Sequence, residues 1–361
     1  MTSGVSRYRW PHEPDIFFFA EADDSSSPMR TPRIYMLATV AFILLATGVF
    51  IARSTQSPAA YLSNPGPMSK QLAAGEPWQD KLRDGSPGPR LVVVPAGSVN
   101  MSASNLGNSD ARASGGILSR TVVLERPFAV GVTEVTVAEF RLYATRSGHD
   151  VAAGCWYHSA QQEWLLNETA HWTGPGYEQG DDSPVTCINW QDAVAYTRWL
   201  SEQTGAVYRL PSEAEFEYFS RAGESGSLPF GAKQEEELCE YVNGADQSTG
   251  LPYATPCSDG FPFAGPVGAF SPNAFGLYDT SGNLWEFTLD CWNATYAASW
   301  RSLFIGPPLD GREWRTGNCR RHVIRGGAFL SSAHNLRLDR REPGAGAMRL
   351  NRVGIRLVRE L

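Results

Sequence analysis

Residues 273–290 read NAFGLYDTSGNLWEFTLD, and this stretch decides the fold. Its aromatic residues are too dense for a solvated loop, and its glycine and asparagine residues are too frequent for a helix. The pattern therefore predicts tight turns packed under Tyr278 and Trp285. Asp279 and Glu286 lie among these turns, and two carboxylates with nearby backbone carbonyls are the oxygen ligands that calcium prefers. The simpler alternative is a capped turn with both acids in water.

The same stretch resembles the signature G-L-Y-D-M-x-G-N-V-W-E-W of the formylglycine-generating enzyme family, whose domains are also called FGE-sulfatase or sulfatase-modifying factor domains. Other family motifs follow in the family's order, at residues 95–97 (PAG), 132–136 (VTEVT), 184–200 (PVTCINWQDAVAYTRWL), 209–223 (RLPSEAEFEYFSRAG), 325–329 (RGGAF) and 354–357 (GIRL). The resemblance covers roughly residues 90–361. It implies a variant of the C-type lectin fold, with a small sheet, flanking helices and long loops stabilised by calcium.

Local patterns predict an α+β domain with little regular secondary structure. Residues 91–94 (LVVV) are typical of a β-strand, which we expect to pair with residues 120–124 and 128–132. Residues 102–116 are small and polar, which indicates a loop. Three helices have polar caps at their starts and glycine at their ends, namely Thr136/Glu139 to Gly148, Asn189/Asp192 to Gly205, and Ser212/Glu215 to Gly223. Beyond residue 223 we expect mostly turns and short strands, held by disulfides and bound cations.

An apolar segment near the start of the chain predicts membrane attachment. Residues 34–52, IYMLATVAFILLATGVFIA, carry no charge and are long enough to cross a bilayer once as a helix. A cleaved signal peptide is the alternative, but its apolar core would be shorter and nearer the start. The predicted organisation is a disordered cytoplasmic tail at residues 1–33, a transmembrane anchor at 34–52, a flexible linker at 53–90 and an FGE-sulfatase-like domain at 91–361.

Two features predict that the domain lies outside the cytoplasm. Basic residues are more frequent before the apolar segment than directly after it, which puts the N-terminus in the cytoplasm. They are Arg7, Arg9, Arg30 and Arg33 before the segment and Arg53 after it. All six cysteines follow the segment and show no C-x-x-C spacing, which favours disulfides in an oxidising compartment over metal binding. We therefore expect a single-pass inner-membrane protein whose C-terminal domain faces the periplasm.

The family resemblance implies two calcium sites. The first site uses the central stretch and maps onto Asp279, Gly282, Leu284 and Glu286, the middle two binding through backbone carbonyls. The second site maps onto Asn243, Gly244, Asp259 and Phe261. Both sets keep their carboxylates. The alternative for each acid is an ordinary surface residue.

The resemblance also implies a catalytic position that this chain does not keep. The enzyme that names the family oxidises a substrate cysteine with two copper-binding thiols, which lie just after the R-G-G-S-W strand. Residues 326–337 of this chain, GGAFLSSAHNLR, contain no cysteine, and Ser331 and Ala333 stand where the thiols would be. A serine hydroxyl cannot replace a thiolate as a soft ligand for Cu(I). We therefore predict neither a copper site nor formylglycine-generating activity.

A groove for a substrate or partner is a further implication. Residues 172–177 (WTGPGY) are similar to the W-x-x-P-G-F element that lines the family's groove. The groove residues expected here are Trp172, Tyr177, Trp285, Ser331, Ser332, His334 and Arg337. Loop packing is the alternative for the aromatic residues, and a salt-bridged edge is the alternative for Arg337. A serine nucleophile with His334 as its base is disfavoured because no G-x-S-x-G elbow is present.

Six cysteines allow fifteen pairings, and local order selects one of them. The expected disulfides are Cys155–Cys187, Cys239–Cys257 and Cys291–Cys319. Each pair encloses a segment with little regular structure, so each bridge is expected to stabilise the domain by about 3 kcal/mol.

Lys and Arg are scattered along a chain of net charge −7, which argues against a nucleic-acid surface. Two other functions fit the features described above. The first function is a binding module for a protein or peptide in the periplasm, as in relatives that are accessory proteins of secretion systems. The second is an oxidase or maturation enzyme that uses a different metal, such as iron, as in relatives that mature siderophore chromophores. The bound metals of the purified protein would separate the two, and the sequence sets no oligomeric state.

Overall fold

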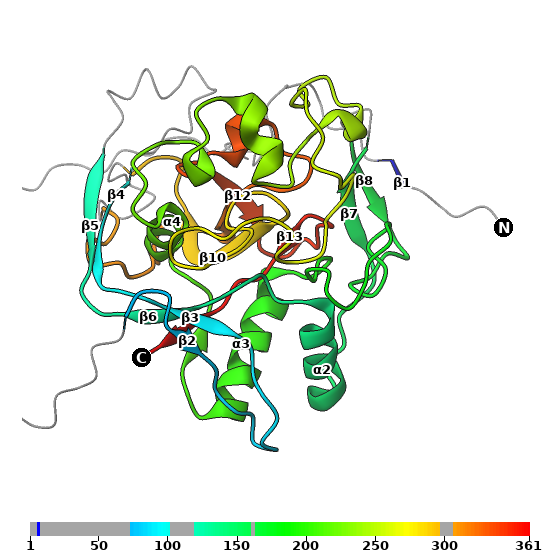
Figure 1. Ribbon diagram of the computed structural model, residues 1–361. Coiled ribbons are helices and arrows are strands. Elements are labelled where there is room, and N and C mark those ends of the chain that lie inside the picture. The colour runs from blue at the N-terminus through cyan, green and yellow to red at the C-terminus, as the bar shows by residue number, and fades with distance from the viewer. Residues whose placement is uncertain (1–5, 8–72, 102–118, 160–162, 297–305) are drawn as a thin grey trace, which may run out of the picture. The chain divides into compact units, whose positions relative to one another are not determined.

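The computed structural model describes residues 6–7, 73–101, 119–159, 163–296 and 306–361 (Figure 1). The predicted transmembrane segment and the predicted loop at 102–116 lie outside these residues. Ser6–Arg7, within the predicted tail, form β1 and pair with β8 (Trp164–Asn167). Among the helices that are described, none is both long enough and apolar enough to span a bilayer.

The domain is a mixture of short strands and a few helices. The remaining strands are β2 (Pro77–Trp78), β3 (Leu91–Val94), β4 (Gly97–Met101), β5 (Arg120–Leu124), β6 (Phe128–Gly131), β7 (Cys155–His158), β9 (Tyr208–Arg209), β10 (Trp285–Trp292), β11 (Asn318–Arg325), β12 (Arg341–Ala345), β13 (Val353–Gly354) and β14 (Val358–Glu360). The α-helices are α2 (Val137–Ser147), α3 (Trp190–Thr204) and α4 (Glu213–Arg221). Short 3-10 turns are η1 (Pro229–Gly231), η2 (Glu235–Glu240), η3 (Gln247–Thr249) and η4 (Ala333–Leu336).

Two sheets carry most of the core. One has five strands in the order β2-β3-β6-β14-β9, and the other has four in the order β12-β11-β10-β13. In Figure 1, α2 and α3 lie next to each other at the lower end of the domain, and the four-stranded sheet lies in the upper half. The central stretch of the sequence runs directly into β10, so its turns lie at the end of the four-stranded sheet.

The strand pairing corrects one prediction. Residues 91–94 pair with residues 128–131, as expected. Residues 120–124 pair instead with β4, in the register Gly97↔Leu124 to Met101↔Arg120. The burial pattern explains this choice, because β3 and β6 are buried at every position whereas β4 and β5 alternate between buried and outward-facing positions. Strands β4 and β5 each bury only one face, so their buried side chains can lie on the same face of the hairpin.

The predicted helix caps are confirmed. All three helices begin with a capping box, in which the cap side chain and the N3 side chain each bind the other's backbone N–H. Helices α2 and α3 end at Gly148 and Gly205 in the left-handed conformation. Helix α4 ends one residue earlier than predicted, at Ala222 with φ 45°.

The N-terminal boundary of the domain lies before residue 91. Strand β2 pairs with β3, and Leu82 is buried. The carboxylate of Asp80 accepts hydrogen bonds from Tyr208 Oη at 2.8 Å and from Arg359 Nε at 3.0 Å. The prediction of a flexible linker is therefore wrong for residues 73–90. Their Pro- and Gly-rich composition is typical of a linker, but it does not show that they contact distant parts of the chain.

All three predicted disulfides form. They are Cys155–Cys187, Cys239–Cys257 and Cys291–Cys319, with sequence separations of 32, 18 and 28. Two of them lie beyond residue 223, where regular structure is sparse. These loops have little regular hydrogen bonding, and the disulfides stabilise them by restricting the unfolded chain.

Candidate functional site

The central stretch forms the predicted tight turns. Asp279, Gly282 and Asn283 all have positive φ angles, of 52°, 83° and 58°. A Cβ atom at Gly282 would lie 2.5 Å from the carbonyl oxygen of Asn243, so only glycine fits there. This close approach brings the two predicted calcium sets, far apart in sequence, into contact.

Glu286 of the first set is paired with an arginine. The Nε and Nη2 atoms of Arg356 donate to the Glu286 carboxylate at 2.8–3.1 Å, and both side chains are fully buried. Arg356 also donates to the backbone carbonyls of Gly131 at 2.9 Å and Tyr278 at 2.8 Å. The guanidinium thus supplies positive charge at the position where the sequence predicted calcium.

Three buried carboxylates surround this single guanidinium. Burial, together with the charges of Asp279 and Glu286, raises the pKa of Glu134 well above its usual range. Burial also raises the pKa of Asp279, and it raises the pKa of Glu286 to about 6 against the opposing effect of Arg356. The cluster of Glu134, Asp279, Glu286 and Arg356, called the acid cluster below, therefore has more acid than its one arginine can balance.

Asn283 joins the acid cluster to the second calcium set. Its Nδ2 donates to Glu134 Oε1 at 3.1 Å, and its Oδ1 accepts from Asn243 Nδ2 at 3.2 Å and from Gly265 N at 2.9 Å. Glu134 and Asn283 are site residues that the sequence did not indicate. Each lies in a quoted motif, VTEVT and SGN, but neither motif shows which distant residue it meets.

Two buried oxygen atoms without hydrogen-bond partners bear on whether a calcium ion would fit these residues. Among the described residues, Glu134 Oε2 and Asn243 Oδ1 have no hydrogen-bond partner. Asp259 is already occupied, because its carboxylate accepts from Gly244 N at 2.9 Å and from Phe261 N at 2.8 Å. No group of three or more His, Cys, Asp or Glu side chains is placed to hold a metal within the described part of the chain. The second set, with its unpartnered amide oxygen, fits a calcium ion better than the first set does.

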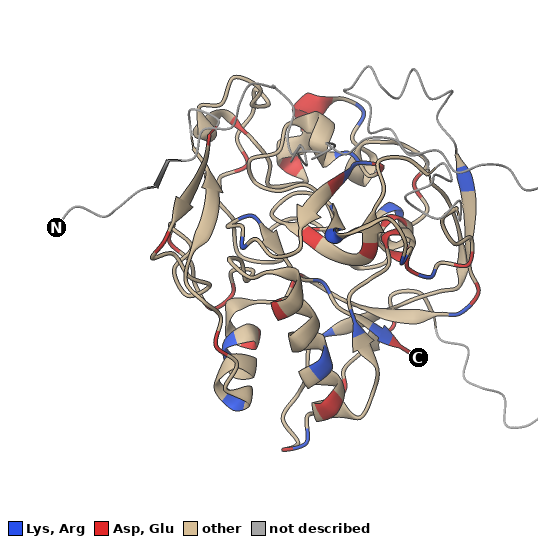
Figure 2. Cartoon of the chain, turned by 180° about the vertical axis from the view of Figure 1, so that it is seen from behind, with Lys and Arg blue, Asp and Glu red and all other residues tan. Residues whose placement is uncertain are grey.

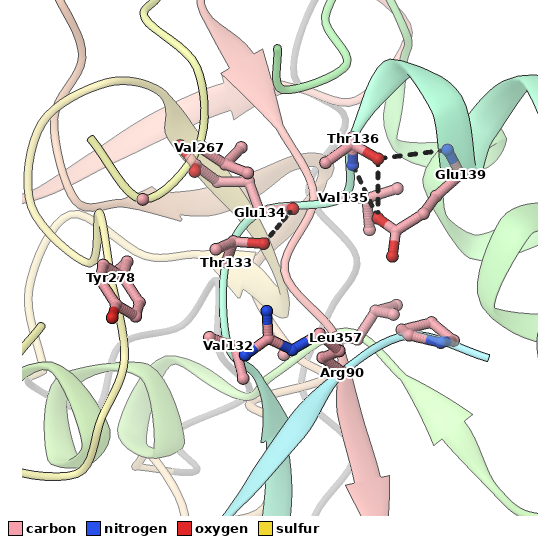
Figure 3. Close-up of a pocket in the computed structure, with 13 residues that line it drawn as sticks. Arg90, Val132, Thr133, Glu134, Val135, Thr136, Glu139, Val267, Tyr278 and Leu357 are labelled. Atoms are coloured by element: carbon pink, nitrogen blue, oxygen red, sulfur yellow. Dashed lines mark hydrogen bonds between the residues drawn. The ribbon is translucent and has the colours of Figure 1, made fainter. Parts of the chain in front are cut away.

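A cavity of about 390 Å³ lies on the Glu134 side of the acid cluster (Figure 3). Its lining includes Arg90, Thr133, Glu134, Thr136, Glu139 and Tyr278. The capping box of α2 forms one wall, where Glu139 Oε2 accepts from Thr136 N at 2.9 Å. Burial raises the pKa of Glu139. Glu134 lines the cavity but is only 1% exposed, so its carboxylate is shielded from solvent.

The segment that replaces the catalytic thiols is a packed turn. Ser331 is 3% exposed, and its Oγ accepts a hydrogen bond from Ala328 N at 2.9 Å. Its carbonyl accepts from Ala245 N at 2.9 Å. The exposed His334 lies in η4, with its Nε2 3.3 Å from Nη1 of Arg340. Ser331 is therefore held as a structural residue rather than as a nucleophile.

The predicted groove residues divide between the core and the surface. Trp172 and Trp285 are buried in the main hydrophobic core, so loop and sheet packing explains them. Arg337 pairs with Asp339 at 3.1 Å, as the salt-bridged alternative requires. Ser332 and Tyr177 are half-buried and remain within reach of a partner.

An aromatic surface lies beside this segment. Tyr177 stacks on Phe263 at a centroid distance of 5.1 Å, and its Oη donates to the carbonyl of Asn351 at 3.0 Å. Phe263 is 45% exposed and Tyr253 is 38% exposed, and Tyr253 Oη donates to the carbonyl of Leu330 at 3.4 Å. Tyr177, Tyr253, Phe263 and Leu330 are called the aromatic patch below. Sequence reasoning missed Tyr253 and Phe263, although aromatic residues in a Pro- and Gly-rich loop were a usable signal.

Acidic and basic segments are interspersed over the view of the domain in Figure 2. Within the aromatic patch, Phe263 and Tyr253 are large aromatic side chains that are exposed to solvent. Such a feature is typical of a protein- or peptide-binding surface.

Comparisons with known proteins agree with the motifs. The family model of the FGE-sulfatase, or sulfatase-modifying factor enzyme 1-like, domain matches residues 79–361. The chain is 31% identical to the formylglycine-generating enzyme of Bos taurus over 274 residues, which are 68% of this chain and 67% of that protein. It is 29% identical to the inactive C-alpha-formylglycine-generating enzyme 2 of Bos taurus over 231 residues, which are 56% of this chain and 71% of that protein.

Among solved structures, PvdO from Pseudomonas aeruginosa is similar, with a TM-score of 0.63 and 30% sequence identity. The match covers 80% of this chain and 99% of that chain. The chain described here therefore belongs to the FGE-sulfatase family of sulfatase-modifying factor enzyme 1-like domains.

Proposed function

We propose that this chain is a membrane-anchored, periplasmic FGE-like domain that binds a protein or peptide and does not generate formylglycine. One observation carries the proposal. The segment expected to hold the catalytic thiols is a buried turn with Ser331 and Ala333 in their place, and an exposed aromatic patch lies beside it. The chain thus keeps the family's fold but has Ser331 and Ala333 in place of the copper-binding thiols, and the aromatic patch offers a surface to a partner.

Cysteine usage supports a non-oxidising role. All six cysteines are in disulfides, so no free thiol remains to bind Cu(I). The sequence similarity extends to a relative whose name describes it as inactive, the Bos taurus protein reported above. The membrane anchor and the periplasmic location rest on residues 34–52 and on the charge and cysteine patterns of the sequence.

A maturation enzyme or oxidase with another metal is the second candidate. The 31% identity to the formylglycine-generating enzyme of Bos taurus over 274 residues favours it, because that relative is named as an enzyme. The metal content of the purified domain separates the two candidates. Calcium alone supports the binding module, whereas stoichiometric iron or copper supports an oxidase.

Calcium removal is expected to destabilise the domain. With calcium about a hundredfold above its Kd, binding would add about 2.7 kcal/mol, which corresponds to a melting temperature roughly 5–10 °C higher than in EDTA. Thermal unfolding measured in both conditions checks this. The Asp259→Asn variant is expected to show a smaller calcium-dependent shift, because a charged group of the second set is lost. Equal melting temperatures with and without calcium for the unmodified domain would remove calcium from the proposal.

Selection of random peptides displayed on phage tests the binding function. The immobilised domain is expected to enrich peptides that carry aromatic or aliphatic residues. Because Phe263 is the most exposed ring of the aromatic patch, Phe263→Ser is expected to weaken the enriched peptides by about tenfold or more. Val207→Ser changes an apolar side chain that is 53% exposed elsewhere on the domain and should leave binding unchanged. Failure to enrich any peptide, or equal binding by both variants, would refute the binding function at this patch.

A further inference from the structure

In the part of the chain that the structure describes, one arginine beside the aromatic patch has no acidic partner of its own. Arg352 directly follows Asn351, whose carbonyl accepts the Tyr177 hydrogen bond. Its guanidinium carbon lies 4.5 Å from the centre of the Trp164 ring, and its Nε is buried without a hydrogen bond. Within the described residues, no ion pair or side-chain hydrogen bond of Arg352 is found. Arg352 is partly buried, and an arginine whose Nε is shielded from water usually has such partners.

The charges around Arg352 do not cancel. The carboxylate of Glu342 interacts electrostatically with the Arg352 guanidinium. That carboxylate is already paired with Arg340. His158 is neutral at physiological pH, because burial and the charge of Arg352 lower its pKa to about 4. Burial also lowers the pKa of Arg352 itself to about 10, so it remains protonated in use. Among the described residues, two arginines thus share one glutamate, which leaves one positive charge there without a counterion.

Position links this charge to the aromatic patch. Arg352 directly follows Asn351 in the chain, and its charge opposes the effect of burial, which raises the pKa of Tyr253. Tyr177 contacts the backbone of the preceding residue, and Tyr253 contacts the segment around Leu330. A peptide that covers the patch would therefore meet an apolar surface and an unbalanced guanidinium at neighbouring positions.

We infer that Arg352 binds the carboxylate of an Asp or Glu side chain in the peptide that covers the aromatic patch. This inference rests on the proposed binding function and names the class of its ligand, an acidic peptide with an apolar residue beside the acid. A guanidinium offers a carboxylate two parallel hydrogen bonds, and burial strengthens them. A phosphate group would call for a cluster of basic residues, whereas one guanidinium is left unbalanced here.

The test uses the peptides enriched from the random phage library and matched versions with each Asp or Glu replaced by its amide. Binding of both to the full domain is measured by fluorescence anisotropy. We expect the acidic peptide to bind about tenfold or more tightly than its amide version, and Arg352→Gln to abolish this preference. Arg312→Gln, at a side chain that is 78% exposed, is the matched control and should keep it.

Each outcome decides a separate claim. If apolar peptides are enriched without acids, or if Arg352→Gln keeps the preference, the inference is wrong while the binding function stands. If no peptide is enriched, both are wrong. If Arg352→Gln does not fold, the unmodified domain still provides the test, because the preference for the acid should shrink as salt rises. A preference that is insensitive to salt contradicts an ion pair at Arg352.

Discussion

Replacing Arg356 with Met is expected to lower the free energy of unfolding by about 3–5 kcal/mol. The substitution leaves Glu286 fully buried without its cation, beside Asp279 and Glu134. It also removes the hydrogen bonds that Arg356 donates to the backbone of residues 131 and 278. Urea unfolding at constant calcium measures the loss.

A double variant shows whether the unpaired charge is the cause. Arg356→Met alone leaves the Glu286 charge buried and unpaired, and adding Glu286→Gln removes that charge. The double variant should therefore lose less stability than the sum of the losses of the two single variants. The exposed pair of Arg312 and Asp310 supplies the matched control, and Arg312→Met should change stability very little. Additive losses, or a small effect of Arg356→Met, would contradict a buried ion pair at the centre of the fold.

Removing the Cys155–Cys187 disulfide as a double Ala variant is expected to cost about 3–4 kcal/mol. The bridge closes a loop with a sequence separation of 32, and both sulfur-bearing side chains are buried. In the chain-entropy account the cost arises because the unfolded chain regains the freedom of that loop. Thermal or urea unfolding of the double variant under non-reducing conditions provides the measurement.

The Cys239–Cys257 pair provides the comparison for this prediction. Its sequence separation is 18, so the corresponding double Ala variant should lose somewhat less stability. Non-reducing peptide mapping of exported protein should find all three bridges. A double Ala variant at 155 and 187 that melts with the unmodified protein would show that this bridge does not stabilise the domain.

Several family motifs are explained by buried ion pairs. Two glutamates of RLPSEAEFEYFSRAG pair with arginines later in the chain, Glu213 with Arg341 at 2.6 Å and Glu217 with Arg325 of RGGAF at 2.6 Å. Glu286 of the central stretch pairs with Arg356 of GIRL in the same way. These motifs therefore identify the fold, and they retain this role in a chain without the catalytic thiols.

The sequence by itself determined the features that depend on near neighbours. The capping boxes join residues three apart, and the disulfides join the nearest cysteines, so both could be predicted from local order. The loss of the thiols at residues 331 and 333 could likewise be identified by matching motifs. Each of these could be identified from the order of residues along the chain, without knowing which distant segments meet.

Only the tertiary structure decided the contacts between distant segments. It placed β5 against β4, included residues 73–90 in the domain and moved Trp172 into the core. It joined Asn283 to Glu134 and left Arg352 beside the aromatic patch with no acid of its own among the described residues. Such contacts depend on which burial patterns and charges meet when the whole chain packs, and a charge has the same appearance in the sequence whether or not a distant partner reaches it.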